Sequence, residues 1–170
     1  MNLYDVMIPQ YLRTLTAAEA ILKKAAAHAD MKKFDVQVLL NDRLAPDMLP
    51  LGKQIQIASD AAKISAGFLT GTTPPKFEDN EVTFAEFQAR LAKTKEYLST
   101  LKREQFEGAE KRKVELPRNP GEFMTGIDYA MSHAMPNFFF HMTTMYAILR
   151  HNGVEIGKKD FLGARPFQKL

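Results

Sequence analysis

Residues 124–153 read MTGIDYAMSHAMPNFFFHMTTMYAILRHNG and combine three of the four histidines with the densest aromatic run of the chain. Thr125 is a good helix N-cap, and Asn152-Gly153 forms a typical helix stop. Pro136 interrupts the pattern, because proline removes a backbone hydrogen bond and clashes with the carbonyl four residues earlier. We therefore predict one long helix over this stretch, kinked or broken around Ser132–Met135.

Composition limits the class of protein. A chain of 170 residues with 45% hydrophobic content is the size of one globular domain, residues 1–170, with a proper core. Its formal charge of +3 is too mild to indicate a nucleic-acid partner, and the absence of cysteine excludes disulfides and a cysteine nucleophile. No apolar run approaches the roughly 18 residues of a membrane span. We therefore expect a cytoplasmic protein with no membrane contact.

Two further stretches have the three-four apolar spacing of amphipathic helices. The first covers residues 3–29, and Pro9 is expected to mark its ordered start or a bend. The second follows Thr83, because Thr83 and Glu86 have the spacing of a capping box. Residues 104–120 lose this periodicity and contain a short alternating segment, which predicts a strand or an extended arm.

A third helix is predicted over residues 47–71, with Asp47 as its N-cap. It has two apolar bands, which predict burial on two sides. The first band is Met48, Leu51, Ile55, Ala58, Ala62, Ser65 and Leu69, and the second is Ile57, Ala61, Ile64 and Phe68. The remaining polar face holds Gln56, Asp60 and Lys63. We interpret this face as solvated, with an ion pair, in preference to the rim of a site.

Together these elements indicate an all-α fold. Four amphipathic helices, with long connections after the second and third, favour a four-helix bundle of up-and-down or crossover topology. The segment 31–46 is expected to be a connector with one short helical turn. The tail 154–170 has too many glycines for a helix. We expect it to be irregular and to pack on the bundle through four apolar side chains, Ile156, Phe161, Leu162 and Phe167.

The last helix carries a set of polar residues that could form a metal site. On a helical wheel it spans an arc of roughly 80°, provided that the proline does not rotate the two halves, and it comprises His133, Asn137, His141 and Thr144. His133 and His141 are about 12 Å apart along the axis, too far to share one ion without a kink. Asn137 is a poor zinc ligand. The alternative is a core histidine, His141, bonded across the bundle to Asp60 or Gln54.

The triplet Phe138–Phe140 points in three directions around one helical turn, so its members cannot share one core stripe. Core packing accounts for two of them. A dimer interface is the interpretation for the third, since symmetric dimers are the commonest soluble oligomers.

Two blocks carry a resemblance to a known family. They are LAPDMLPLGKQIQIASDAAK at residues 44–63, and PNFFFH with YAILRHNGVEIGKKDFLG within residues 136–163. Through them the chain resembles the bacterial family called domain of unknown function 1993, in the DinB/YfiT-like superfamily. The resemblance extends over essentially the whole chain and implies a four-helix bundle that is usually dimeric.

The resemblance also bears on the metal site. Metal-binding members of the superfamily carry one histidine on helix two and a His-x-x-x-His pair on helix four, before an aliphatic stretch ending in Leu-Arg. Aligned on Leu149-Arg150, His141 matches the second histidine of the pair and Asn137 the first. The helix-two histidine has no counterpart, and the nearest candidates are Gln54, Gln56 and Asp60.

These residues support two hypotheses of different classes. The first is a homodimeric small-ligand-binding or structural protein with a degenerate metal site between the second and fourth helices, lined by His141, Asn137, His133, Asp60, Gln56 and Gln54. The alternative is a metal-dependent enzyme, of hydrolase or thiol-transferase type, in which His141 and Asp60 hold zinc or nickel or act as an acid/base pair. A nucleic-acid role would require Lys102–Lys113 to form a continuous basic patch.

Overall fold

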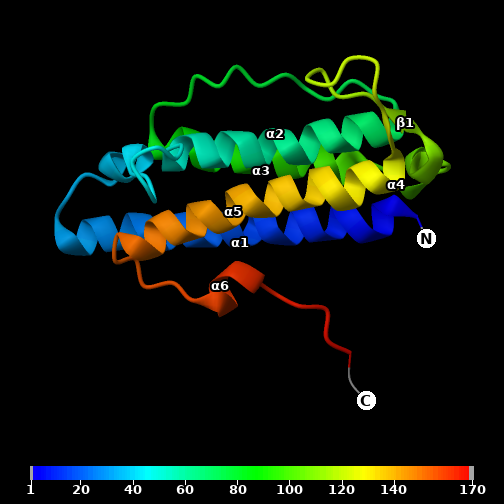
Figure 1. Ribbon diagram of the computed structural model, residues 1–170. Helices are drawn as coiled ribbons and strands as arrows, with labels where there is room; N and C mark the ends of the chain where they lie inside the picture. The colour runs from blue at the N-terminus through cyan, green and yellow to red at the C-terminus, as the bar shows by residue number, and fades with distance from the viewer. Residues whose placement is uncertain (1, 169–170) are drawn as a thin grey trace.

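Four helical rods carry the core of the computed structural model, which describes residues 2–168 (Figure 1). The first three rods are α1 (Leu3–Lys32), α2 (Leu51–Thr70) and α3 (Phe84–Thr100). The fourth is composite and consists of α4 (Gly126–Tyr129), the π-helical turn η4 (Ala130–Ala134) and α5 (Met135–His151). The predicted all-α four-helix bundle is confirmed.

The bundle has a crossover topology. α2 and α3 run in the same direction, opposite to α1 and to the α4–α5 rod (Figure 1). α2 packs against α3 and α5, and α1 closes the ring by packing against the same two helices. Two parallel neighbours require a return connection, which residues 71–83 provide by running back along the outside of the bundle. Of the two predicted topologies, the structure therefore has the crossover form.

Helix α1 begins earlier than Pro9. The side chain of Asn2 caps it by accepting a hydrogen bond of 2.9 Å from the backbone N–H of Tyr4. Leu3 and Met7 are fully buried, so the turns that precede the proline are anchored in the core. Pro9 itself is exposed inside the helix, and the prediction that it marks the ordered start is wrong.

Helix α2 starts later than predicted. Asp47 lies in a turn outside the helix, and Pro50 occupies the N-cap position with extended backbone angles. The residue before a proline is disfavoured in helical conformation, so residues 47–49 cannot continue the helix backwards. The predicted end is confirmed, because Gly71 adopts the left-handed conformation with φ of 71° at the C-cap.

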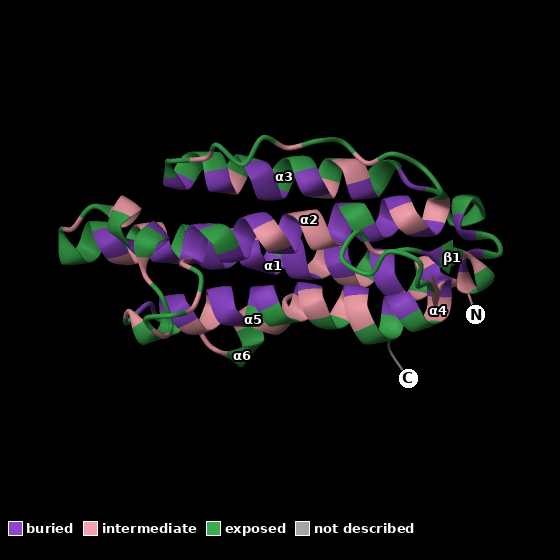
Figure 2. Ribbon diagram, turned by 45° about the horizontal axis from the view of Figure 1, so that its top comes forward, coloured by how far each residue is buried: buried purple, intermediate pink, exposed green. Residues whose placement is uncertain are grey.

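The three faces of α2 differ in how far they are buried (Figure 2). The first apolar band is buried from Leu51 onwards, as predicted. The second band is only partly covered, and Ile64 is 38% exposed. The polar face, by contrast, is covered by α3 and residues 71–83, so that Gln56 and Lys63 are buried. The interpretation of this face as solvated is therefore wrong.

Helix α3 has the capping box that the sequence predicts, because the Thr83 side chain accepts from the Glu86 N–H and Glu86 accepts from the Thr83 N–H. Short elements lie in the connections after α1 and after α3. They are η1 (Val36–Asn41) before α2, and η2 (Arg103–Phe106), η3 (Ala109–Lys111), β1 (Lys113–Val114) and β2 (Met124–Thr125) after α3. β1 and β2 pair antiparallel, which confirms the predicted short strand.

Pro136 lies at the predicted interruption of the fourth rod. It lies in the first turn of α5, where its missing N–H is tolerated, directly after the π-helical turn. Within that turn the Ser132 hydroxyl donates to the carbonyl of Asp128. The rod changes geometry at Met135 and continues, so the predicted interruption is present as a change of helix type and not as a chain break (Figure 1).

The tail contains a helix that the sequence analysis did not expect. Helix α6 (Lys158–Leu162) is enclosed by two glycines and capped by Asp160, whose carboxylate accepts from the Gly157 N–H at 2.8 Å. It packs on α1 through the ion pair of Asp160 with Lys24 at 2.6 Å. Phe161 lies against Tyr146, as expected for a docked tail. Phe167 is 78% exposed, so its predicted docking is wrong.

A helix that crosses a lipid bilayer needs about 20 predominantly apolar residues. Within residues 2–168, no helix combines the length and the apolar character that crossing a membrane demands.

Candidate functional site

The centre of the candidate site is a buried hydrogen bond between α5 and α2. The Nδ1 atom of His141, a residue only 8% exposed, lies 2.7 Å from Oε1 of Gln54. The amide nitrogen of Gln54 donates to the carbonyl of Leu49 at 2.8 Å. This second bond fixes the orientation of the amide, so that Oε1 accepts the proton of Nδ1–H. His141 is thereby assigned the tautomer with a free lone pair on Nε2.

The sequence expectation for this pair is fulfilled. Gln54 lies among apolar residues of α2 and therefore needs a hydrogen-bond partner, which His141 supplies. Desolvation by burial lowers the pKa of His141, which favours the neutral ring that the tautomer requires. The arrangement is a neutral amide–imidazole pair.

The lowered pKa of His141 predicts a pH dependence of stability. In the unfolded chain His141 takes up a proton below pH 6.5, whereas in the folded chain it does so only at lower pH. Proton uptake therefore favours the unfolded chain, so the free energy of unfolding is highest above pH 6.5 and decreases as the pH falls below it. Unfolding free energies at pH 7.5 and 5.5 should therefore differ more for the wild type than for His141→Gln. Equal differences in the two proteins would contradict this account.

The other polar residues of the rod are engaged differently. His133 stacks on Tyr129, with ring centroids 5.5 Å apart, and Tyr129 in turn contacts Phe68 of α2. The Thr144 hydroxyl donates to the carbonyl of its own helix four residues earlier. Asn137 lies half-buried one helical turn before His141. Of the predicted polar set, Asn137 is thus the residue placed to act with His141.

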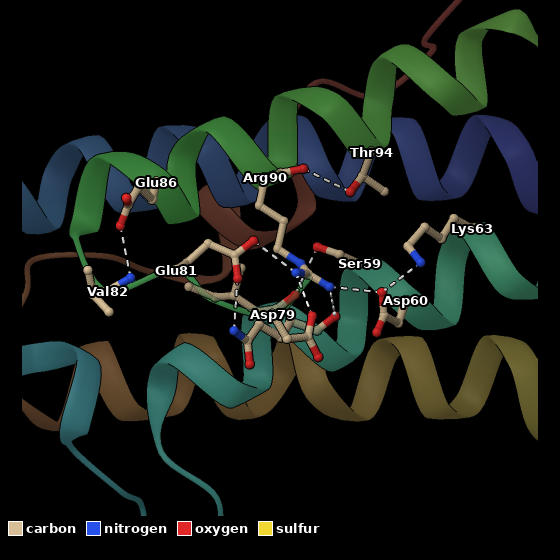
Figure 3. A network of polar contacts seen from close by, with 11 residues as sticks. Ser59, Asp60, Lys63, Asp79, Glu81, Val82, Glu86, Arg90 and Thr94 are labelled. Atoms are coloured by element: carbon tan, nitrogen blue, oxygen red, sulfur yellow. Dashed lines mark hydrogen bonds and ion pairs between the residues drawn. The ribbon is translucent and has the colours of Figure 1, made fainter. Parts of the chain in front are cut away.

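Asp60 lies on the other side of α2, beside a buried arginine (Figure 3), and the backbone carbonyl of Gln56 accepts a hydrogen bond from the same arginine. Arg90 of α3 is 2% exposed and reaches three carboxylates. These are Asp60 at 2.8 Å, Asp79 at 2.7 Å and Glu81 at 2.9 Å. Lys63 also pairs with Asp60 at 2.9 Å, and the Gln56 amide donates to Glu81 at 2.9 Å. We call these residues, with Phe77, the Arg90 cluster.

The surroundings of Glu81 in the cluster favour its ionised form. Burial alone would raise the pKa of Glu81, but hydrogen bonds from Arg90 and Gln56 outweigh it and hold the pKa below its usual range. The cations Lys63 and Arg90 face the Phe77 ring, at 4.8 Å and 5.1 Å from its centroid. The cluster thus joins α2, α3 and residues 71–83.

The predicted metal pair is not formed. Gln54 and Asp60 are six residues apart, which corresponds to about 240° on a helix, so they face different neighbours. His141 bonds to Gln54, whereas Asp60 is occupied by Arg90 and Lys63. In the part of the chain that the structure describes, no group of three or more His, Cys, Asp or Glu side chains could hold a metal ion. The six predicted pocket residues therefore divide among three places: Gln54 and Asn137 lie near His141, Gln56 and Asp60 lie at the Arg90 cluster, and His133 lies on Tyr129.

Comparisons with known proteins agree with this architecture. A family model described as "Domain of unknown function (DUF1993)" matches residues 3–162. The chain belongs to the DUF1993 family. The chain is also similar to the crystal structure of a DinB family member from Shewanella denitrificans, with 46% sequence identity and a TM-score of 0.95. The similarity covers 99% of this chain and 96% of that one. Among proteins with curated descriptions, none matches.

The structure of this DUF1993 protein adds Arg90, a site residue that the sequence did not indicate. The sequence does not single out Arg90 among the charged residues of α3, and only the fold brings residues 71–83 over it. The available signal was the acidic segment Glu78–Glu81, which needs cationic partners when it lies against a bundle. Of the three helix-two candidates, the structure selects Gln54 as the partner of His141.

Proposed function

We propose that this DUF1993 protein is a homodimeric binding protein for a small polar ligand, in which the metal site of distant relatives is degenerate. The buried bond between His141 and Gln54 carries this proposal. Gln54 faces His141 from α2, the helix on which metal-binding members of the superfamily carry a histidine. Asn137 lies one helical turn before His141 on α5. An amide, an imidazole and a second amide form a neutral set that binds through hydrogen bonds, because amides are poor zinc ligands.

The same geometry indicates how a ligand would be recognised. With Nδ1–H of His141 committed to Gln54, Nε2 is a hydrogen-bond acceptor. The Asn137 side chain can donate and accept. A ligand with an O–H or N–H next to an acceptor atom matches this pair. The enzyme alternative has less support, because Asp60 is neutralised by Arg90 and Lys63 on the other side of α2.

Metal binding tests the degenerate site. Protein purified without a histidine tag should contain almost no zinc or nickel, and His141→Ala should not change this. The double variant Gln54→His/Asn137→His should gain about one bound Zn²⁺ or Ni²⁺ per chain, because three imidazoles then meet at one place.

The matched control is Gln56→His/Asn137→His, whose new α2 histidine points toward α3 and should leave the metal content unchanged. Stoichiometric metal in the wild type that disappears in His141→Ala would overturn the proposal in favour of the metal-dependent enzyme.

The homodimer rests on an apolar face along α2 and α5. Ile64 is 38% exposed and Phe140 is 56% exposed, and half-buried Ile57, Ala61 and Phe68 continue the same stripe of α2. The stripe meets the fourth rod where Phe68 contacts Tyr129. Exposed apolar patches mark interaction surfaces, and a symmetric dimer pairs the same patch on both copies.

Light scattering should therefore give about twice the 19.2 kDa mass of one chain. Ile64→Asp/Phe140→Asp should give a monomer with unchanged helix content. Met31→Asp, at an exposed apolar residue near the end of α1, serves as the control and should remain dimeric. A monomeric wild type at tens of micromolar would contradict the homodimer.

A further inference from the structure

Residues 71–83 cover a surface of α2 and α3 that is lined by buried polar side chains and that we call the floor. Gln56, Ser59 and Lys63 of α2 and Arg90 of α3 are all at most 5% exposed. Two buried cations in such a place require anionic partners, because an unpaired buried charge is strongly unfavourable. The groups that supply those anions therefore decide what this floor can bind.

Most of the negative charge comes from the crossover segment 71–83, which we call the strap. Asp79 and Glu81 both contact Nη1 of Arg90, at 2.7 Å and 2.9 Å (Figure 3). Phe77 adds an aromatic face over Lys63 and Arg90. The strap thus presents two carboxylates and a ring to the cations, as a small organic anion would.

The floor has hydrogen-bonding capacity that the strap leaves unused. Arg90 donates through Nη1 and Nη2 to the three carboxylates and to the carbonyl of Gln56. Its Nε atom, and Oε1 of Gln56, are buried without a hydrogen-bond partner among the described residues. Buried polar atoms normally have a partner. An unused donor and an unused acceptor beside bound carboxylates are features of a ligand site.

The strap is attached by few side chains. Residues 73–82 have no regular secondary structure, and most of their side chains are exposed. Within this stretch, the half-buried residues are Pro74, Phe77 and Glu81, with a half-exposed Asp79 on Arg90. Loops with few buried contacts open locally at low free-energy cost. The strap can therefore leave the floor while the four rods remain folded.

We infer that the floor formed by α2 and α3 binds a small dicarboxylate, and that the strap occupies this floor as an internal ligand through Asp79 and Glu81. An external dicarboxylate competes for Nη1 of Arg90 and for Lys63, and its binding lifts the strap. The site lies on the opposite side of α2 from the Gln54–His141 pair and does not depend on it.

Malonate, with sodium chloride at matched ionic strength, is the probe. In the double variant Asp79→Asn/Glu81→Gln, malonate should raise the thermal midpoint by about 4 °C at saturation, because it restores the missing carboxylates. Trypsin cleavage after the exposed Lys76 should be about tenfold faster in this variant than in the wild type, since the strap is released. Glu78→Gln, at an exposed strap carboxylate, should behave as the wild type in both measurements.

Adding Lys63→Gln to the double variant should abolish the malonate effect. A midpoint shift that persists in this triple variant, or that chloride reproduces, would overturn the proposal, because the anion would then act elsewhere. If the double variant does not fold, the wild type decides. Malonate should speed its cleavage after Lys76 severalfold relative to chloride, and an unchanged rate would equally overturn the proposal.

Discussion

Replacing Arg90 by leucine is expected to lower the free energy of unfolding by about 3 kcal/mol. Arg90 is the shared partner of Asp60, Asp79 and Glu81, and its side chain is 1% exposed. Leucine fills part of the volume but leaves three carboxylates around one remaining cation, Lys63. Removing one partner of a buried charge cluster is costly because the others stay desolvated without compensation. Some of the loss is recovered because Asp79 is half exposed and can be hydrated.

Urea denaturation with linear extrapolation measures this effect. The control is Arg103→Leu, which removes an exposed pair with Asp5 of similar geometry, with 2.9 Å between charged atoms. Exposed pairs contribute about 0–1 kcal/mol, so Arg103→Leu should differ little from the wild type. Similar losses in the two variants would show that the Arg90 cluster is not a buried electrostatic unit.

Substituting Gly126 by alanine is expected to lower the free energy of unfolding by about 3 kcal/mol. A Cβ atom at this position would overlap the backbone carbonyl oxygen of Ala109 and approach a methyl group of Leu69 to 3.1 Å. The obstacle is backbone, so no side-chain rotation relieves it. The pairing of β1 with β2 holds the two segments together, and α4 would have to move away from η3.

Gly157→Ala is the matched control for this effect. A Cβ atom on Gly157 meets no atom within 4 Å, and its φ of −140° is open to any residue. Its free energy of unfolding should fall by less than about 1 kcal/mol, because alanine is a poorer N-cap than glycine but meets no steric obstacle at this position. If Gly126→Ala is equally mild, the contact between α4 and η3 can relax, and the close approach is not a constraint on the fold.

Several helix boundaries of the fold could be predicted because they depend on residues that are close together in the sequence. Thr83 and Glu86 define the start of α3 because a capping box involves only residues three apart. Pro136 predicts the irregular turn before α5 because its ring restricts its own helix. Asp47 is not the start of α2 because Pro50 restricts the residue before it to a non-helical conformation.

The candidate site could be predicted only in part, because it depends on contacts between distant segments. Gln54 could be recognised as a polar residue on an apolar side that needs a partner, and His141 was among the candidates. A helical wheel gives the direction of Asp60 but not what covers it. Arg90 and the strap meet Asp60 only through the crossover, which brings together residues about 20 to 30 positions apart.

The π-helical turn sets the phase between the two halves of the fourth rod. Tyr129 and Phe138 are nine residues apart, which in an uninterrupted α-helix would put them about 180° apart, yet both are buried. A π turn accommodates one extra residue, and so delays the rotation of everything after it by about 100°. It behaves as a one-residue insertion retained within a regular helix. Both aromatic side chains therefore reach the same core, although no single amphipathic wheel could describe them.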